Sequence, residues 1–276
     1  FNSPSSLFSE DDIITHQINW NAKSQNIHKI CKNLNISLLD TIFVDDSDYE
    51  CDEVQANCKG ISIFKVPKNI YKYPFMLTSS ELFYKEYVSS EDEFRTDLYK
   101  KNIERELLKS KIESDDCAVF KWIESLNLRL NIENISPNDP KIPRIIQLFN
   151  RTNQFNLSGS KYSEFSFNKS LNDNTYYFGE AFDRIGSEGL ISVIGFKLCD
   201  KSIFVKDFIL SCRVFGRYIE ESMLLPILDN ALKKNCDIYF NLIENNRNNV
   251  ILKFLKKISN DNYHLSISDI KRLCKE

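Results

Sequence analysis

The sequence lacks several features that would place it in a familiar class. No run of about 18 apolar residues occurs, so no ordinary transmembrane helix is predicted. The net charge is only −3, from 36 basic and 39 acidic residues, so composition gives no reason to expect a nucleic-acid partner. The first residues have neither the basic nor the apolar region of a signal peptide. These absences predict a globular protein that binds no membrane and no nucleic acid.

Cysteine is present, but in no CxxC pair. The eight cysteines lie mostly inside apolar runs, and a disulfide framework is not expected in a chain of 276 residues without secretory features. We therefore expect reduced thiols and a cytoplasmic protein. The three histidines stand far apart in the sequence, so no metal site built on a histidine cluster is predicted.

The first third of the chain alternates helical and strand-like patterns. Residues 24–36 place apolar side chains at helical spacing, with Ser24 as the expected N-cap. Residues 42–44 and 61–67 have the pattern of short buried strands. This alternation predicts a parallel α/β sheet. Residues 89–112 then predict a long charged helix that connects to a second domain.

Beyond residue 113 the order of the elements changes. A helix, a strand and two more helices precede three strand-like runs, and the turn signal GSEG at 186–189 separates the first two. The third run leads into an amphipathic helix at about 217–234, and a strand, a helix and a last strand follow. This order predicts a second domain, and a resemblance to a known family, carried by the junction at 208–221, implies that it is an α/β domain with a mixed sheet.

The junction FILSCRVFGRYIEE, at 208–221, carries the most chemistry. Arg213, Gly216 and Arg217 stand where the strand becomes the helix. Unpaired N–H groups at a helix start, a glycine that allows close approach and two guanidinium groups together suit a phosphate. The same residues also fit an ordinary strand-to-helix corner.

The spacing Arg213-x-x-Gly216-x-Tyr218 resembles the acyl-CoA-binding motif of the GNAT acyltransferases, Gln/Arg-x-x-Gly-x-Gly/Ala. The resemblance implies a GNAT domain whose Arg213, Gly216 and Arg217 bind CoA or a phosphopantetheine thioester. Two departures weaken it. Tyr218 replaces a small residue, and Phe254-Leu255 stands where related sequences tend to have Phe-Tyr, so the usual acid for the leaving thiolate is missing.

Further stretches narrow the resemblance. NRTNQFNLS at 150–158, followed by LSCRVFGR at 210–217, looks like the C-terminal half of the FkbH-like proteins. INWNAKSQNIHKICKNLNISLLDTIFVDDSDYE at 18–50 is similar to the portion that precedes it in that family. FkbH-like proteins join a HAD-type phosphatase domain of subfamily IIIC to a GNAT-like domain. The resemblance runs over nearly the whole chain.

The domain organisation that this resemblance implies has three parts. The C-terminal part of a HAD-like parallel sheet domain is expected at 1–88, a helical connector at 89–113 and a GNAT-like acyltransferase domain at 114–276. The nucleophilic D-x-D motif that HAD phosphatases carry after their first strand follows no apolar strand here. We therefore expect that the chain starts past this motif, as a fragment, and that it does not hydrolyse phosphate alone.

Three residues carry the HAD resemblance. It implies that Lys23 neutralises phosphate and aspartate charge and takes part in catalysis. Asp45 and Asp46 follow a buried strand, at the edge of the sheet where ligands bind, and their carboxylate oxygens suit Mg²⁺. A surface lysine and a solvated strand end are the simpler interpretations.

FkbH-like proteins are associated with placing a glyceryl unit from a phosphorylated glycerate on an acyl carrier protein. The resemblance therefore implies an acyltransferase whose partners are that carrier and a small phosphorylated or thioester substrate. Cys212 is the candidate nucleophile, because it stands beside Arg213 and just before a helix start, where a thiolate is favoured. A small buried core residue is the alternative interpretation.

A polar segment follows the helix predicted at 141–149. Its amides and hydroxyl suit recognition of a polyol or of a pantetheine amide, although helix capping and a polar turn would use the same residue types. The candidate residues are Asn150, Thr152, Asn153, Gln154 and Asn156. Two other functions stay open: a GNAT N-acyltransferase that uses acetyl-CoA on an amine or amino sugar, and a non-catalytic binding module.

Overall fold

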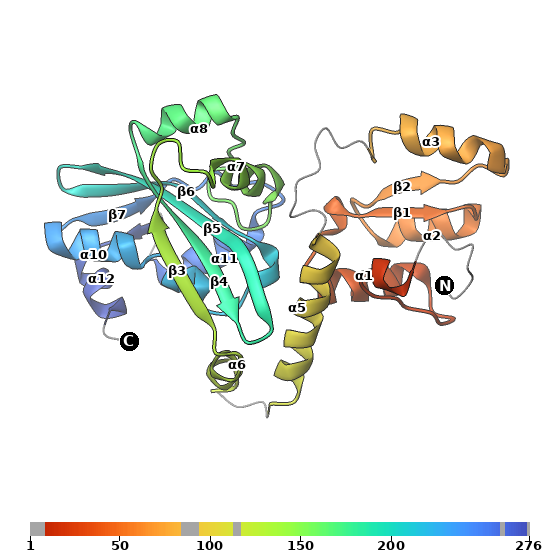
Figure 1. The fold of residues 1–276 in the computed structure, drawn as a ribbon, viewed down its shortest axis with the longest axis horizontal. Coiled ribbons are helices and arrows are strands. Elements are labelled where there is room, and N and C mark those ends of the chain that lie inside the picture. Colours follow the sequence, from red (N-terminus) through yellow and green to blue (C-terminus); the bar gives the residue numbers. More distant parts are fainter. Residues whose placement is uncertain (1–8, 84–93, 113–116, 260–262, 275–276) are drawn as a thin grey trace. The chain divides into compact units, whose positions relative to one another are not determined.

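The structure, a computed structural model, describes residues 9–83, 94–112, 117–259 and 263–274. The chain divides into two compact units, Phe1–Lys111 and Ile112–Glu276 (Figure 1). The stretch ESDD at 113–116, where the sequence predicts the domain boundary, lies outside the described residues. None of the helices in the described ranges is long and apolar enough to cross a membrane.

The first unit contains a two-stranded parallel sheet. β1 (Ile42–Asp45) pairs with β2 (Ser62–Lys65), and α2 (Asp48–Asn57) connects the two strands. The apolar core between them is small and is centred on the buried residues Val54 and Cys58. The pairing is the parallel one that the alternating pattern predicts, but two strands do not show a HAD-like fold.

Helices complete the first unit. α1 (Lys23–Leu34) packs on α2, and α5 (Arg95–Ser110), the described part of the predicted connector, packs on α1. Ser24 is not the N-cap of α1, since Ala22 precedes the helix and the Ser24 hydroxyl donates to Glu53 of α2. The shorter elements are η1 (Glu10–Asp12), η2 (Leu38–Asp40), η3 (Ile70–Lys72) and α3 (Tyr73–Ser79).

The second unit is built on a six-stranded mixed sheet, which confirms the mixed α/β prediction. Its strand order is β3-β4-β5-β6-β7-β8, and all neighbours are antiparallel except β6 and β7, which are parallel. The strands are β3 (Arg129–Asn134), β4 (Thr175–Asp183), β5 (Gly186–Cys199), β6 (Ser202–Leu210), β7 (Asp237–Phe240) and β8 (His264–Leu265).

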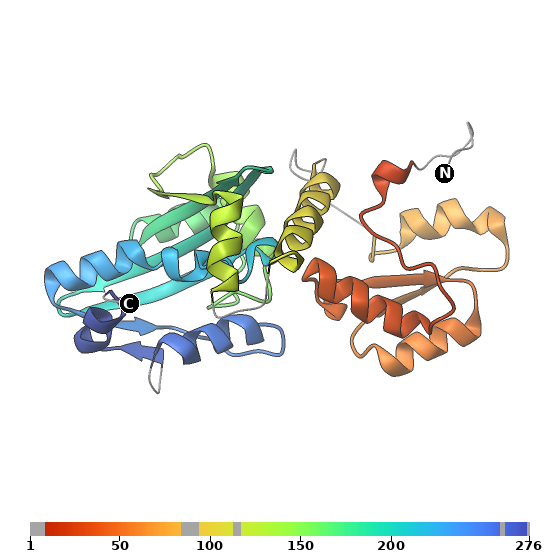
Figure 2. The same ribbon diagram turned by 90° about the horizontal axis from the view of Figure 1, so that it is seen from below.

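Helices cover both faces of this sheet and create two apolar cores. α7 (Ile142–Arg151) and α8 (Glu164–Leu171) enclose the smaller core against β4 and β5. The larger core lies against the other face, and the helices that enclose it can be followed in Figure 2. Its helices are α9 (Ile219–Ser222), α10 (Leu225–Lys234), α11 (Asn249–Ile258) and α12 (Ile267–Leu273), and α6 (Ala118–Leu126) precedes β3.

Two local predictions in this unit are wrong. The β4–β5 turn does not lie at GSEG, because Asp183 pairs with Gly186 and the Asp183 carboxylate accepts the N–H groups of Ile185 and Gly186. The single helix predicted at 217–234 is two helices, and Pro226 stands in the first turn of the second one, where a proline is tolerated. The sequence also does not predict α12, which follows the last strand.

Candidate functional site

A sharp turn after β6 brings the motif residues together. η4 (Cys212–Val214) follows the strand, and two residues with positive φ lie before α9: Gly216 at 72° and Tyr218 at 56°. A Cβ added to Gly216 would meet no atom within 4 Å, so its backbone borders open space. Glycine adopts this conformation readily, whereas a tyrosine resists it by about 1–2 kcal/mol. The turn therefore holds Tyr218 in place against its own backbone preference.

The two arginines of the motif face a carboxylate inside the unit. Arg217 donates to Glu188 Oε1 at 2.8 Å, and Arg213 donates to the Glu188 carbonyl oxygen at 3.2 Å. Glu188 is fully buried, and the guanidinium of Arg217 also lies over the ring of Trp122. These contacts link the turn to β5, so the guanidinium groups of Arg213 and Arg217 point into the unit, toward Glu188.

A different side chain binds the exposed backbone of the turn. Glu220 Oε1 accepts the Gly216 N–H at 3.0 Å, while Glu220 Oε2 accepts no hydrogen bond from any residue that the structure describes. The side chain is only 8% exposed. Burial raises the pKa of this carboxyl, and nearby Glu221 raises it too, against the lowering effect of the backbone N–H bonds and of Lys257.

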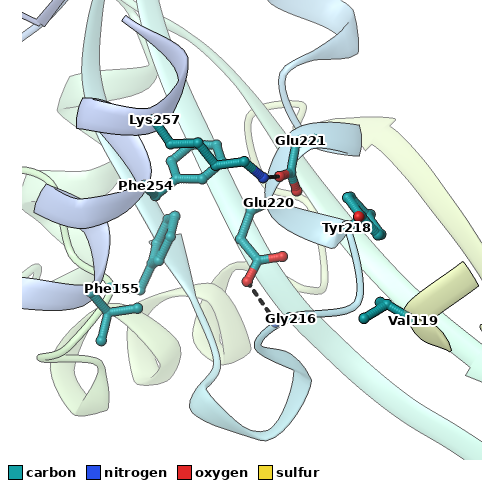
Figure 3. Close-up of a pocket in the computed structure, with 9 residues that line it drawn as sticks. Val119, Phe155, Gly216, Tyr218, Glu220, Glu221, Phe254 and Lys257 are labelled. Carbon is teal, nitrogen blue, oxygen red and sulfur yellow. Dashed lines mark hydrogen bonds and ion pairs between the residues drawn. The ribbon is translucent and has the colours of Figure 1, made fainter. Parts of the chain in front are cut away.

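A cavity of about 290 Å³ opens at this turn (Figure 3). One side is formed by Gly216, Tyr218, Glu220 and Glu221, and the other is mainly apolar. The remaining lining residues are Val119, Phe155, Val250, Phe254 and Lys257. The volume is at the lower end of the range for small-molecule pockets, about 300–1,000 Å³. The cavity therefore suits a small ligand, or a narrow part of a larger one.

The charged and aromatic groups at this cavity are paired. Lys257 donates to Glu221 at 3.0 Å, and this contact raises the pKa of the lysine. The Lys257 ammonium also lies 5.7 Å from the centre of the Tyr218 ring, which stacks on Phe120 at 4.8 Å. Because Lys257 pairs with Glu221, Glu220 is the carboxyl of the lining that has no ion-pair partner among the described residues.

The chain's own backbone fills the space between the ends of β6 and β7. Leu157 donates to the Phe208 carbonyl oxygen at 3.0 Å, and Leu210 donates to that of Phe155 at 3.1 Å. On the other side, Ile243 donates to the Leu157 carbonyl oxygen at 2.9 Å. The three residues from Phe155 to Leu157 thus form an extra strand-like segment. Phe155, which belongs to this segment, is one of the residues that line the cavity.

The polar side chains predicted to bind substrate, from Asn150 to Asn156, are not among the residues that line the cavity. Their contacts stabilise the chain around the strand-like segment instead. The Asn150 side chain bonds both the N–H and the carbonyl oxygen of Tyr162. Asn156 is buried, donates to the Thr152 carbonyl oxygen and accepts the N–H of Gly159. The other contacts are Lys161 to the Asn153 amide oxygen and Ile251 to the Gln154 carbonyl oxygen.

Cys212 stands at the carboxyl end of β6, half-buried, at the start of η4. It is four residues before Gly216 and is not among the residues that line the cavity. The structure therefore brings Gly216 to the cavity, places Cys212 on the same turn, and directs Arg213 and Arg217 to Glu188.

The three HAD-related residues lie in the first unit. Lys23 is exposed at the first position of α1, Asp46 is exposed after β1, and Asp45 accepts the N–H of Ser47 at 2.9 Å. Within the described ranges, no group of three or more His, Cys, Asp or Glu side chains could hold a metal ion. The expected Mg²⁺ site therefore gains no support.

The turn does not fit the diphosphate of CoA as the sequence predicts. A phosphate would need the Gly216 N–H, which binds Glu220, and free guanidinium groups, whereas Arg213 and Arg217 bind Glu188. α9 has only four residues, so its dipole adds little for an anion. The residues around the turn do not support binding of an intact CoA diphosphate here.

Glu220 is the functional candidate that the sequence-based reasoning missed. The signal for it is the spacing Gly216-x-x-x-Glu220 across a turn, because an acid four residues after a glycine can reach back to its N–H. The resemblance drew attention to the basic residues of the motif instead.

Comparisons with known proteins give weak similarities. No protein-family model matches the chain, and no curated protein matches it. The PaiA N-acetyltransferase of Thermoplasma acidophilum, in complex with coenzyme A, is 13% identical, with 49% of this chain and 94% of that chain covered and a TM-score of 0.34. A GNAT family acetyltransferase of Elizabethkingia anophelis with acetyl-CoA bound is 14% identical, with 48% and 78% covered and a TM-score of 0.33.

A third solved structure is similar over a shorter part. It is the ribosomal-protein-S18-alanine N-acetyltransferase of Escherichia coli, 9% identical, with 40% of this chain covered and a TM-score of 0.31. The chain spans 64% of the length of that protein. At such identities and TM-scores, activity and ligand have to be argued from the residues of this chain.

Proposed function

We propose that the second unit is a GNAT-like acyltransferase domain of the FkbH-like type, which transfers a glyceryl or similar small hydroxyacyl group to an acyl carrier protein. The observation that carries this proposal is the cavity at the turn after β6, where Gly216 and Glu220 face an apolar wall of Phe155, Val250 and Phe254. It lies on the same turn as a half-buried thiol, Cys212. A thiol on the turn that borders a small, mostly apolar cavity suits acyl transfer through a thioester.

The lining supports a carrier-bound arm over free CoA. The pantetheine arm is uncharged along its length and carries amide N–H groups, which a carboxylate such as Glu220 can accept. On a carrier protein its single phosphate is attached to the carrier, outside the cavity. CoA would bring a diphosphate to a turn whose N–H already binds Glu220.

The proposed chemistry proceeds in two balanced steps. The Cys212 thiolate attacks the carbonyl carbon of the activated acyl group, and the donor's leaving group departs with the bonding electrons. The thiol of the carrier's arm then loses its proton to solvent and attacks the acyl-cysteine. This second attack forms the new thioester and releases the Cys212 thiolate.

The other predicted residues have supporting roles in this proposal. The five residues of the polar segment do not line the cavity, and in this proposal Asn150 and Asn156 hold the segment that carries Phe155. In the first unit, Lys23, Asp45 and Asp46 are the remaining HAD-like residues. They would act on a phosphorylated substrate, with Mg²⁺, only together with a nucleophilic aspartate.

Intact-protein mass spectrometry tests the acyl-transfer step. The protein is incubated with a glyceryl or acetyl thioester of pantetheine, and we expect an acyl adduct that is lost in Cys212→Ala and discharged by the carrier's thiol. Cys199→Ala is the matched control, because Cys199 is an exposed cysteine of the same unit. An adduct that persists at full yield in Cys212→Ala would contradict the nucleophile assignment.

A second candidate function is N-acylation of an amine with acetyl-CoA. The observation that favours it is the free oxygen of Glu220, since a buried carboxylate in a cavity can bind an ammonium group and accept its proton. Tight CoA binding without any protein adduct would favour this function. A binding module without catalysis would give neither an adduct nor turnover.

A further inference from the structure

The cavity contains a carboxyl group, that of Glu220, at the position where the turn would bind an anion. The carboxylate of Glu220 binds the Gly216 N–H at 3.0 Å, which is the contact that a phosphate oxygen would make with such a turn. The Glu220 side chain is only 8% exposed, and its second oxygen has no partner among the residues that the structure describes. The side chain lies at the centre of the lining in Figure 3.

We propose that Glu220 is a specificity-determining residue, which excludes diphosphate-bearing ligands from the cavity and selects an uncharged ligand that carries an N–H or O–H donor. The inference rests on the proposed function and deepens it, because it concerns the same cavity and names the residue that separates a bare pantetheine arm from CoA.

The first argument is electrostatic. An anion at Gly216 would have to displace the Glu220 carboxyl from the N–H or lie beside it in a partly desolvated site, where the ionised carboxyl repels it strongly and the protonated one still occupies the N–H. The cations nearby do not offset this repulsion. Lys257 pairs with Glu221, and Arg213 and Arg217 lie beneath the turn, against Glu188.

The second argument concerns shape. Gly216 leaves open space at its Cα, so the backbone itself does not prevent the approach of a ligand. Among the described residues, the Glu220 side chain is the group that accepts the Gly216 N–H. A single substitution should therefore convert the turn from one that rejects an anion into one that admits it.

The third argument concerns the ligand that the cavity accepts. The unpartnered Glu220 Oε2 can accept one hydrogen bond, and Phe155, Val250 and Phe254 offer apolar contact on the opposite side. A chain of methylene and amide groups satisfies both demands, because its N–H donates to the carboxylate and its carbons pack on the rings.

Isothermal titration calorimetry with pantetheine, CoA and inorganic pyrophosphate tests the inference. The wild-type protein should bind pantetheine at least as tightly as CoA and should not bind pyrophosphate. Glu220→Ala should gain affinity for pyrophosphate and for CoA by about tenfold or more, and Glu220→Gln should gain less, because its amide oxygen still accepts the Gly216 N–H.

Asp229→Asn is the matched control, because it removes one negative charge from an exposed position of α10 in the same unit. It should leave both affinities unchanged. Circular dichroism and thermal melting establish that each variant is folded. A folded Glu220→Ala with no gain for pyrophosphate would overturn the inference, as would tight pyrophosphate binding by the wild-type protein.

The result is distinguishable from a failure of the proposed function. If Glu220→Ala gains pyrophosphate affinity but the wild-type protein forms no acyl adduct, the specificity role stands and acyl transfer fails. If the adduct forms and Glu220→Ala gains nothing, acyl transfer stands and the specificity role fails.

Discussion

Two buried carboxylates of the second unit differ in how their oxygens are bonded. Asp207, on β6, is fully buried and accepts hydroxyl groups from Ser158, Tyr162 and Tyr176 at 2.6–2.8 Å. Glu220 accepts the Gly216 N–H and leaves its second oxygen toward the cavity. Because buried polar groups are normally satisfied, the complete set indicates a structural role, and the incomplete one leaves an oxygen available to a water or a ligand.

The tyrosines around Asp207 are correspondingly fixed in their protonated form. Burial, together with the negative charge of Asp207, raises the pKa of Tyr162 to about 12 and also raises that of Tyr176. Tyr176 reaches Asp207 across an intervening strand, because the three residues Tyr176, Gly195 and Asp207 lie in register on β4, β5 and β6. A side chain at Gly195 would lie 2.1 Å from the Tyr176 ring.

The largest expected effect follows from breaking the complete site. Asp207→Ala leaves buried hydroxyl groups without an acceptor, so the free energy of unfolding should fall by about 3–5 kcal/mol. Urea denaturation followed by tryptophan fluorescence measures it. Glu220→Ala is the contrasting variant and should change stability by less than about 1 kcal/mol, since water can replace its contact with the exposed Gly216. Equal losses in the two variants would remove the distinction.

A smaller effect concerns how the contribution of Glu220 to the stability of the fold depends on pH. Since the pKa of Glu220 is raised in the folded protein, its proton stabilises the fold most fully below the carboxyl pKa of the unfolded chain. That stabilisation is lost as the pH rises through the raised value. The free energy of unfolding of the wild-type protein, minus that of Glu220→Gln, should therefore decrease from a pH of about 4 upward. A difference that stays constant across this range contradicts the assignment; parallel urea titrations at each pH measure it.

The smallest expected effect concerns the rim of the cavity. Tyr218→Gly relieves a left-handed backbone by about 1 kcal/mol and loses a ring stack with Phe120 of about 0.5–1.5 kcal/mol, so the net change should be near zero. A double-mutant cycle with Phe120→Ala separates the two contributions. We expect Phe120→Ala to destabilise the wild-type protein and to have little effect in the glycine variant.

Sequence patterns predicted the elements better than the contacts between them. The apolar runs of β6 and β7 are clear in the sequence, because a buried strand needs little beyond a short apolar stretch. β1 was predicted as a buried strand as well, but its residues are half-buried or exposed. The partner of Arg213 and Arg217 could not be predicted in the same way. Glu188 is the unpaired residue of a β-bulge, between the pairs Ala181–Gly189 and Phe182–Ser187, and the sequence does not indicate where such a bulge falls.

The HAD-related residues illustrate another limit. Asp45 is the last residue of β1 and Asp46 follows it, but the sequence does not indicate which neighbouring side chains would complete a metal site. In the part of the chain that the structure describes, no such companions gather there. The prediction from the resemblance therefore remains a proposal that needs residues beyond those described.

The segment from Phe155 to Leu157 determines how the cavity can adapt. Its backbone is bonded to β6 on one side and to Ile243 on the other, so Phe155 cannot shift without breaking hydrogen bonds of the sheet. A ligand of a different size must therefore be accommodated by the side chains of α11, which contributes Val250, Phe254 and Lys257 to the lining. If related chains accept substrates of different length, the side chains of α11 should differ among them. The segment from Phe155 to Leu157 should then keep the same backbone position.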